Sequence, residues 1–505
     1  MYNADCSNNM TMQKTSFEIK NFICSLKKLL PLANSHMVHF ITQNLFERLI
    51  PKHLQEEIMS LSINDANDLV LGSFSKINPQ NERAPQLCDF LIQTHKLSLS
   101  ESDLCLSFES LCTYLGSRGF GECSSCIIKN LMSVKKSHEV EMMSGIIDAL
   151  ARTEKCTHVV DIGGGKGYLS SVLALKHHLK VLSIDSSFIT SKSAIKQIPK
   201  VEKLWTSLHK KASKIENTTN GSINTQSSNE EPQQKSADLC KVATMYITEE
   251  TNVVKLIEDE FQEEVGGIAL VGLHTCGNLA ASSLRMFANN PVHMKCLVNV
   301  GCCYHLIVEE FDTNPPWLEV QSAASGIGFP MSTYLRDEGF VLGRNARMLA
   351  AQPPDRISHE GTLQTEALFY RALLEVYLEK KLCPPNGLPH FRVGKIAKKC
   401  SSFQEYVTKS VQRLGLNIQV DDGELQELYD SHSEKRKQLH VFFLLRLCVA
   451  PAIEAAIMLD RLLYLREQGI QDAYLTQLFD PVVSPRCYAI VAFNKISSTT
   501  SQTVQ

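Results

Sequence analysis

The chain has 505 residues, enough for two or three domains that each bury a core. Hydrophobic residues make up 44% and charged residues 21%, which is ordinary for a soluble globular protein. A formal net charge of −3 excludes the strongly basic field of a general nucleic-acid binder. Any RNA contact therefore has to come from local patches, and we expect no DNA partner.

The N-terminal part of the chain is predicted to be helical over residues 1–130. Its first residues, MYNADCSNNMTMQ, lack the pattern of a signal peptide, so we expect none. Cys123 and Cys126 form a C-x-x-C without a second pair nearby, which favours a plain loop over a zinc site. The 17 cysteines have no regular spacing and favour a reducing compartment, so we predict a cytoplasmic or nuclear protein.

Residues 131–365 show an alternating pattern of strands and helices. Ser133 is a predicted N-cap for the helix SVKKSHEVEMMSGIIDALA. The alternation predicts a doubly wound α/β sheet, whose buried parallel strands we place at 157–163, 180–186, 241–247, 267–274 and 295–301. Residues 209–240 are rich in Ser, Thr, Asn, Gln and Glu, and we predict a disordered insertion there.

The C-terminal part, residues 366–505, is mostly helical by pattern. Its apolar segment 439–465 contains Pro451 and four charged residues, which favours an amphipathic or buried helix pair over a membrane span. We therefore expect no membrane partner. The run RCYAIVAFNK near the end is typical of a strand and is expected to complete the sheet.

A glycine-rich loop, within VVDIGGGKGYLSSVLA, is the most informative motif. It has the form Asp161-x-Gly163-x-Gly165-x-Gly167 between a strand and a helix. A dinucleotide-binding loop needs a third glycine where this chain has Tyr168. A phosphate-binding P-loop needs Ser or Thr after Gly-Lys, and the lysine here is followed by glycine. Neither phosphate motif fits.

The same loop suits S-adenosylmethionine. Glycines let the backbone approach the amino-acid part of this ligand, while Asp161 lies near its amine. Asp185 ends the next predicted strand, where an acid can accept hydrogen bonds from both ribose hydroxyls. We therefore predict that S-adenosylmethionine binds at Asp161, Gly163, Gly165, Gly167 and Asp185. The alternatives are a nicotinamide cofactor and an ordinary tight turn.

Several sequence blocks together resemble the methyltransferase-like protein 25 family, whose relatives are named for a ribosomal RNA adenine dimethylase-type domain. The blocks run from about residue 35 to the end of the chain and include VVDIGGGKGYLS, GLHTCGNLA, NVGCCYHL, GFPMS, GRNARMLAAQ, LFYRALLE, LDRLLYLRE and LFDPVVSPRCYA. The resemblance implies a class I, Rossmann-like methyltransferase fold that uses S-adenosylmethionine. It leaves the substrate open.

A tetrapeptide, Asn314 to Trp317, reads NPPW and resembles the motif of amino-methylating enzymes. That motif belongs at the end of the fourth strand, where this chain has His274, Thr275, Cys276 and Gly277. NPPW follows the fifth strand instead. A surface turn is the interpretation that its position favours.

Two polar clusters follow the fourth and fifth predicted strands. His274, Cys276 and Asn278 follow the fourth strand, and Cys302, Cys303, Tyr304 and His305 follow the fifth. The carboxyl ends of neighbouring parallel strands meet at one edge, so we expect the clusters to share a cleft. His274 or His305 can act as a general base, and the thiols as nucleophiles or metal ligands. Alternatively, these small residues only pack beneath the cofactor, and whether a metal binds stays open.

Nearby basic residues are further candidates for contacts with substrate. Lys135, Lys136 and His138 precede the first strand, and Arg344 and Arg347 lie in GRNAR. They can bind a phosphate or carboxylate, or simply be solvated surface charges.

The sequence thus predicts an S-adenosylmethionine-dependent methyltransferase with His274, Cys276, Cys302, Cys303 and His305 as candidate catalytic residues. The favoured substrate is RNA, with protein second. A non-catalytic cofactor-binding or scaffold protein is the rival class, and the intact motif acids argue against it. Oligomeric state is not predicted.

Overall fold

The computed structural model divides into two compact units. The structure describes residues 2–74, 81–117, 132–219, 236–312, 326–361, 363, 365–382, 391, 393, 394 and 396–494. The first unit comprises Met1–Lys20, Ser102–Val341 and Ala456–Gln505, and the second Asn21–Glu101 and Leu342–Ala455. This division differs from the predicted regions 1–130, 131–365 and 366–505. The first unit draws sheet strands from all three of those regions.

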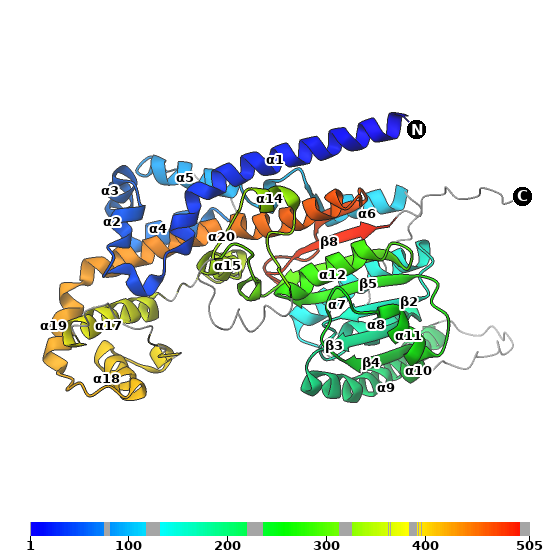
Figure 1. Ribbon diagram of the computed structural model, residues 1–505. Helices are drawn as coiled ribbons and strands as arrows, with labels where there is room; N and C mark the ends of the chain where they lie inside the picture. Colours follow the sequence, from blue (N-terminus) through cyan, green and yellow to red (C-terminus); the bar gives the residue numbers. More distant parts are fainter. Residues whose placement is uncertain are drawn as a thin grey trace, which may run out of the picture. The chain divides into compact units, whose positions relative to one another are not determined.

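The first unit is built on one eight-stranded sheet (Figure 1). Its order is β1-β7-β8-β6-β5-β2-β3-β4, and every neighbouring pair is parallel except those that β8 makes with β6 and β7. The strands are β1 (Cys105–Ser107), β2 (His158–Ile162), β3 (Lys180–Asp185), β4 (Cys240–Thr244), β5 (Ile268–Cys276), β6 (Met294–Cys302), β7 (Ala473–Gln477) and β8 (Tyr488–Phe493). The predicted α/β class with a mostly parallel sheet is confirmed.

The five predicted parallel strands correspond to β2, β3, β4, β5 and β6, with ends displaced by a few residues. The predicted last strand is β8, which pairs with β6. Burial explains why these strands were recognisable, since all five residues of β2 and nearly all of β6 are buried. β1 and β7 were not predicted. They are short and only partly buried.

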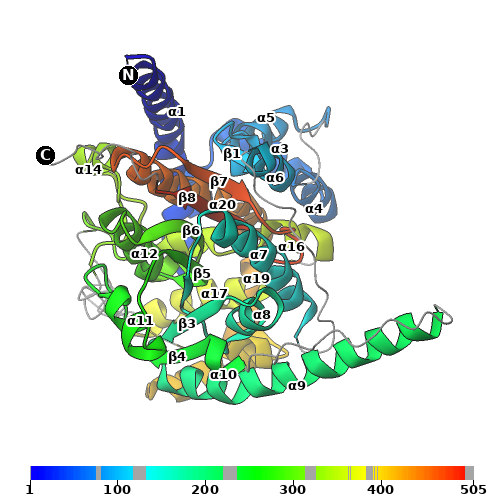
Figure 2. The same cartoon turned by 90° about the vertical axis from the view of Figure 1, so that its right-hand side faces the viewer.

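Helices cover both faces of the sheet (Figures 1 and 2). Besides parts of α1 and α20, the helices and 3-10 turns among the described residues of this unit are α6 (Phe108–Ser117), α7 (Val134–Thr153), α8 (Tyr168–His177), α9 (Phe188–Thr219), α10 (Ser236–Leu239), α11 (Val253–Phe261), α12 (Asn278–Asn289), η3 (Tyr304–Leu306) and α14 (Thr333–Asp337). The predicted N-cap is confirmed, because Ser133 accepts a hydrogen bond from Lys136 N. α7 and α8 share one core with alternate residues of the central strands, such as Val159 and Val298. α12 lies against the opposite face of β5 and β6.

The predicted disordered insertion at 209–240 is wrong at both ends. α9 continues to Thr219, α10 begins at Ser236, and β4 begins at Cys240. Figure 2 shows α9 extending past the sheet. The stretch HKKASKIE contains good helix formers, and these outweigh its lack of apolar residues. Residues 220–235 lie outside the described residues.

The apolar segment near the C-terminus forms one continuous helix, α20 (Ser433–Glu467), rather than a helix pair. Pro451 lies inside it. By length and composition α20 is able to cross a membrane, but 89% of its most apolar window is buried inside the protein. Its charged residues have protein partners: Arg446 donates to the carbonyls of Leu32 and Ala33, at the end of α1 (Tyr2–Asn34).

The second unit is helical. Besides parts of α1 and α20 it contains η1 (Met37–Phe40), α2 (Leu45–Leu49), α3 (Lys52–Ser60), α4 (Ile63–Gly72), α5 (Pro85–His95), η2 (Leu99–Glu101), α15 (Arg344–Ala350), α16 (Pro354–Glu360), α17 (Glu366–Leu382), η5 (Ile396–Lys399), α18 (Phe403–Leu414) and α19 (Asp422–Ser431). Glu375 of α17 bonds His39 Nδ1 at 2.6 Å and Thr42 Oγ1 at 3.0 Å. These bonds attach α17 to the segment around η1.

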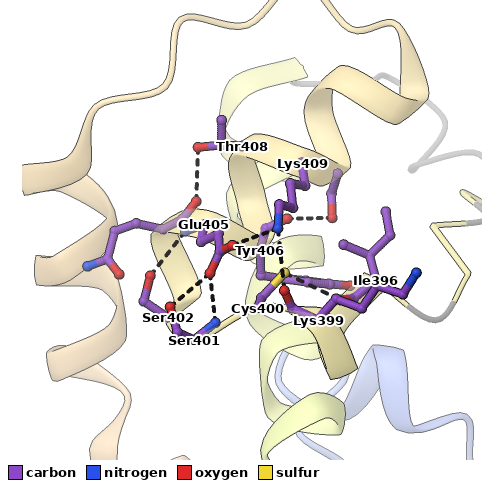
Figure 3. Close-up of polar contacts among 11 residues, drawn as sticks. Ile396, Lys399, Cys400, Ser401, Ser402, Glu405, Tyr406, Thr408 and Lys409 are labelled. Atoms are coloured by element: carbon purple, nitrogen blue, oxygen red, sulfur yellow. Dashed lines mark hydrogen bonds and ion pairs between the residues drawn. The ribbon is translucent and has the colours of Figure 1, made fainter.

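The start of α18, in the second unit, is fixed by side-chain hydrogen bonds (Figure 3). The Ser402 hydroxyl accepts from Glu405 N at 3.2 Å, and the Glu405 carboxylate accepts from Ser401 N at 2.7 Å. Lys409 Nζ donates to Glu405 Oε1 at 2.6 Å, and with the Ser401 bonds this lowers the pKa of Glu405 to about 2. Such a cap satisfies the first N–H groups of the helix.

Candidate functional site

The sheet reverses its direction of growth between β2 and β5. From β2 the chain adds β3 and β4 on one side, whereas β5 and β6 lie on the other side. β2 and β5 pair in parallel, so their carboxyl ends flank this switch point. Ligands of open α/β sheets bind at such points. The glycine loop follows β2 and the first polar cluster lies at the carboxyl end of β5, which places both beside the switch point.

The glycine loop needs its glycines for two different reasons. Gly163, Gly165 and Gly167 have φ values of +72°, +59° and +72°, a left-handed region that other residues rarely adopt. Gly164 has no such φ, but a Cβ atom there would lie 2.0 Å from Ser183 Oγ on β3. The loop therefore passes too close to the Ser183 hydroxyl of β3 for a side chain at Gly164 to fit without a rearrangement.

Asp161 is a buried acid with an unused oxygen. It is 1% exposed, and its Oδ2 accepts a 2.5 Å hydrogen bond from Ser170 Oγ of α8. Its Oδ1 is buried without a hydrogen-bond partner among the described residues. Burial raises the pKa of Asp161 to about 6. An oxygen of this kind fits a cationic ligand amine, reached directly or through water.

Asp185 ties the glycine loop to the end of β3. Its Oδ2 accepts from Gly165 N at 3.1 Å, and its Oδ1 accepts from Ser187 N at 2.8 Å. Each carboxylate oxygen can still accept a further hydrogen bond. The residues predicted to bind S-adenosylmethionine are thus assembled at one place. They fit its amine at Asp161 and its ribose at Asp185.

His274 occupies a distorted position near the end of β5. The pairing of β5 with β6 shifts register between Leu273 and Thr275, and His274 has φ +68°. Irregularities of this kind redirect a side chain and cluster at functional sites. The irregular pairing breaks the alternating side-chain directions of the strand at His274. Its Nε2 atom lies 3.0 Å from Glu139 Oε1.

Glu139 is a fully buried carboxylate on α7 that sequence reasoning missed. It accepts from Ser484 Oγ at 2.6 Å, and Lys136 Nζ lies 2.8 Å from its Oε2. Burial alone would raise its pKa, but the bonds from His274, Lys136 and Ser484 hold the pKa of Glu139 well below its usual value. Glu139 is therefore a carboxylate, and it fixes the orientation of the His274 ring. Nothing in the helical pattern of α7 marks this glutamate in the sequence.

Three predicted cysteines converge at the ends of β5 and β6. Cys276 and Cys302 are register partners, and their Sγ atoms lie 3.1 Å apart. Cys303 Sγ lies 3.4 Å from Cys276 Sγ and 3.7 Å from Cys302 Sγ. Cys303 has φ +49°, so a second irregular backbone position is needed to bring it there.

The three thiols differ in acidity because they share protons. Hydrogen bonds from Cys276 and Cys302, with smaller contributions from the charges of His305 and His274, outweigh burial and lower the pKa of Cys303 to about 2. Hydrogen bonding to Cys276 and Cys303, together with burial, raises the pKa of Cys302. For Cys276 the bond with Cys302 lowers the pKa, but Cys303 and burial raise it to about 11 in sum. Cys303 is therefore the most acidic thiol of the group.

The other predicted residues of the two clusters have different surroundings. His305 lies in η3, near enough to influence Cys303. The Asn278 side chain makes two hydrogen bonds with backbone groups: its Oδ1 accepts from Val308 N at 2.8 Å, and its Nδ2 donates to Gly326 O at 2.7 Å. Tyr304 is buried, with the Arg486 guanidinium over its ring at 5.5 Å. Asn278 and Tyr304 therefore support the cluster structurally.

The predicted basic contacts with substrate are largely taken up within the protein. Lys135 and Lys136 both lie near the Glu139 carboxylate, at 3.5 and 2.8 Å. His138 Nε2 accepts from Asp480 N at 3.1 Å. Arg347, in the second unit, is fully buried and so cannot meet a substrate at the surface. Cys123, Cys126 and the NPPW tetrapeptide lie outside the described residues.

Comparisons with known proteins agree with this geometry. Residues 135–310 match a family model described as a methyltransferase domain. The chain is 29% identical to the human protein named "Probable methyltransferase-like protein 25", over 95% of this chain and 97% of that protein. It is 28% identical to the mouse protein of the same name, over 95% and 96%. The chain thus contains a methyltransferase domain, and its resemblance to the methyltransferase-like protein 25 family is confirmed over nearly its whole length.

Proposed function

We propose that this methyltransferase uses S-adenosylmethionine as methyl donor and RNA as acceptor. The observation that supports this donor is the glycine loop beside the switch point, behind which the Oδ1 atom of Asp161 is buried without a hydrogen-bond partner among the described residues. Asp161 receives the donor's amine and Asp185 its ribose, and the open backbone of Gly165 lets the donor lie against the loop. When bound, the donor supplies an electrophilic methyl group.

His274 is the candidate general base for the acceptor. Its Nε2 faces the Glu139 carboxylate, so Nε2 carries the proton in the neutral ring and Nδ1 is left as the acceptor. A proton that leaves the acceptor group during methyl transfer moves to Nδ1. Glu139 then stabilises the imidazolium by its charge, as a buried carboxylate does for a catalytic histidine.

The choice of RNA is supported by the resemblance to relatives named for a ribosomal RNA adenine dimethylase-type domain. A protein acceptor is the second candidate. The net charge of −3 limits RNA contact to local patches. The intact acids Asp161 and Asp185 argue for an active enzyme over a scaffold.

The test measures transfer of a tritiated methyl group from S-adenosylmethionine into separated RNA and protein fractions from cells that lack this protein. Wild-type protein is expected to label RNA, and Asp185→Ala is expected to label it much less at a limiting donor concentration, because the donor binds more weakly. Asp259→Ala, which removes an exposed acid on α11, is the control and should label normally. Label confined to protein would overturn the RNA acceptor. No label in either fraction, from enzyme that binds the donor, would overturn both acceptor classes.

A further inference from the structure

The group formed by Cys276, Cys302 and Cys303 is held by the sheet itself. Cys276 ends β5 and Cys302 ends β6, and the two are register partners of one parallel pair. Strand pairing therefore fixes two of the three sulfur positions, and the irregular backbone at Cys303 supplies the third. Three sulfur atoms meet within 3.1–3.7 Å of one another.

These sulfur separations approach those of a metal-bound set. Tetrahedral zinc holds thiolates at about 2.3 Å, which places neighbouring sulfurs roughly 3.8 Å apart. The three observed distances of 3.1, 3.4 and 3.7 Å require only small outward movements to reach that spacing. Cys276 is exposed and Cys303 is partly exposed, so an ion can reach the group from solvent.

The chemistry of the ligands narrows the choice of metal. Thiolates select soft or borderline ions, namely zinc, copper(I) and the iron of iron–sulfur clusters. Iron–sulfur clusters take four protein ligands as a rule, and this group has three cysteines. A tetrahedral site with three protein ligands and one exchangeable position is the arrangement of catalytic zinc.

We propose that Cys276, Cys302 and Cys303 bind one zinc ion with an exchangeable fourth position. One zinc ion and three thiolates carry a net charge of −1. The ion joins the end of β5 to the end of β6. If the proposed function holds, the fourth position is available to an atom of the acceptor, on the same edge of the sheet as Asp185, whose charge already acts on Cys276.

The first experiment measures the zinc content of the full-length protein, purified without chelators under reducing conditions. Wild-type protein is expected to hold about one equivalent, and Cys276→Ser and Cys302→Ser at least fivefold less. Cys156→Ser is the matched control, because Cys156 and Cys296 form a sulfur pair at 3.8 Å without a third ligand among the described residues. This control should retain its zinc.

A second measurement uses the wild-type protein alone, so that its result does not depend on whether a variant folds. Replacement of zinc by cobalt(II) in wild-type protein should give the visible absorption of a tetrahedral, thiolate-bound ion, and this spectrum should change when imidazole is added. Wild-type protein that holds less than about a tenth of an equivalent of any metal, with its thiols free, would overturn the site. A Cys276–Cys302 disulfide in the freshly purified reduced protein would overturn it as well. A metal other than zinc would overturn the identity of the ion.

Two variants separate the zinc site from the donor site. Asp185→Ala should keep its zinc and bind the donor more weakly. Cys276→Ser should lose zinc and keep donor affinity within about twofold, because its sulfur does not belong to the glycine loop. Zinc lost in both variants would indicate general unfolding, which the circular dichroism of each variant would reveal.

Discussion

Substitution of Gly164 by alanine tests the packing of the glycine loop independently of any ligand. The new Cβ would lie 2.0 Å from Ser183 Oγ and 3.2 Å from Asp161 Oδ2. No carbon and oxygen atoms approach to 2.0 Å without a bond, so the loop or Ser183 has to move. Ser183 is 2% exposed, which leaves its hydroxyl little space to rotate.

The expected cost follows from this contact. Overpacking by one methyl group in a filled core destabilises by about 1–3 kcal/mol. A shift of the thermal midpoint of roughly 1.5–5 °C follows for a unit of this size. Removal of the hydroxyl should restore most of the loss, because the remaining contacts, with Asp161 Oδ2 at 3.2 Å and Ser183 Cβ at 3.3 Å, are far less severe. The double variant Gly164→Ala/Ser183→Ala is therefore expected to be more stable than Gly164→Ala.

The assay is a double-mutant cycle on thermal midpoints followed by circular dichroism. Gly165→Ala is the matched control, since its cost comes from φ +59° and its Cβ would have space. That cost, about 1 kcal/mol, should be unchanged by Ser183→Ala. Equal effects of Ser183→Ala in both glycine backgrounds would refute the proposed contact.

Three further predictions concern the buried acids. Glu139→Gln should lower methyl transfer by about 10²–10⁴ with donor affinity retained, because His274 loses its charged partner; unchanged turnover in a rate assay would contradict this role. Asp161 has a pKa of about 6 when folded, above the ordinary aspartate pKa of 3.8, so its contribution to the unfolding free energy is present at pH 4 and lost as pH rises through 6. Asp161→Asn should therefore reduce the decline in denaturation midpoint over that range, and an unaltered pH profile would argue against the burial of Asp161. Asp460 accepts from Met331 N and Ser332 N at 2.7 and 2.9 Å, so Asp460→Ala should lower the melting temperature by leaving both N–H groups unpaired, which a scanning calorimeter can measure.

The sequence predicted the central sheet well because its strands are continuous apolar runs between recognisable turns. It also predicted that the two polar clusters would be neighbours, since they follow adjacent strands. It did not predict β1, which has three residues, or β7, whose sequence AYLTQ alternates weakly. Pro451 suggested a break in α20, but a proline inside a largely buried helix is tolerated when packing outweighs the lost hydrogen bond.

The sequence predicted those parts of the site that are marked by particular residue types at fixed spacing. Glycine and aspartate at fixed spacing identified the loop. The contact of Glu139 with His274 joins α7 to β5 across a long sequence separation, and no local pattern reports it. The requirement for Gly164 likewise comes from β3, through Ser183. Such contacts become visible only when the strands are paired.

Calorimetric titration of S-adenosylmethionine into wild-type protein and Asp185→Ala tests the central claim most directly. Wild-type protein should bind this donor with a micromolar dissociation constant and should not bind NAD. Asp185→Ala should weaken the binding by roughly 1.5–3 kcal/mol, the usual cost of lost hydrogen bonds to a charged acceptor. Binding of NAD, or equal affinity of the two proteins for S-adenosylmethionine, would contradict the assignment of the glycine loop.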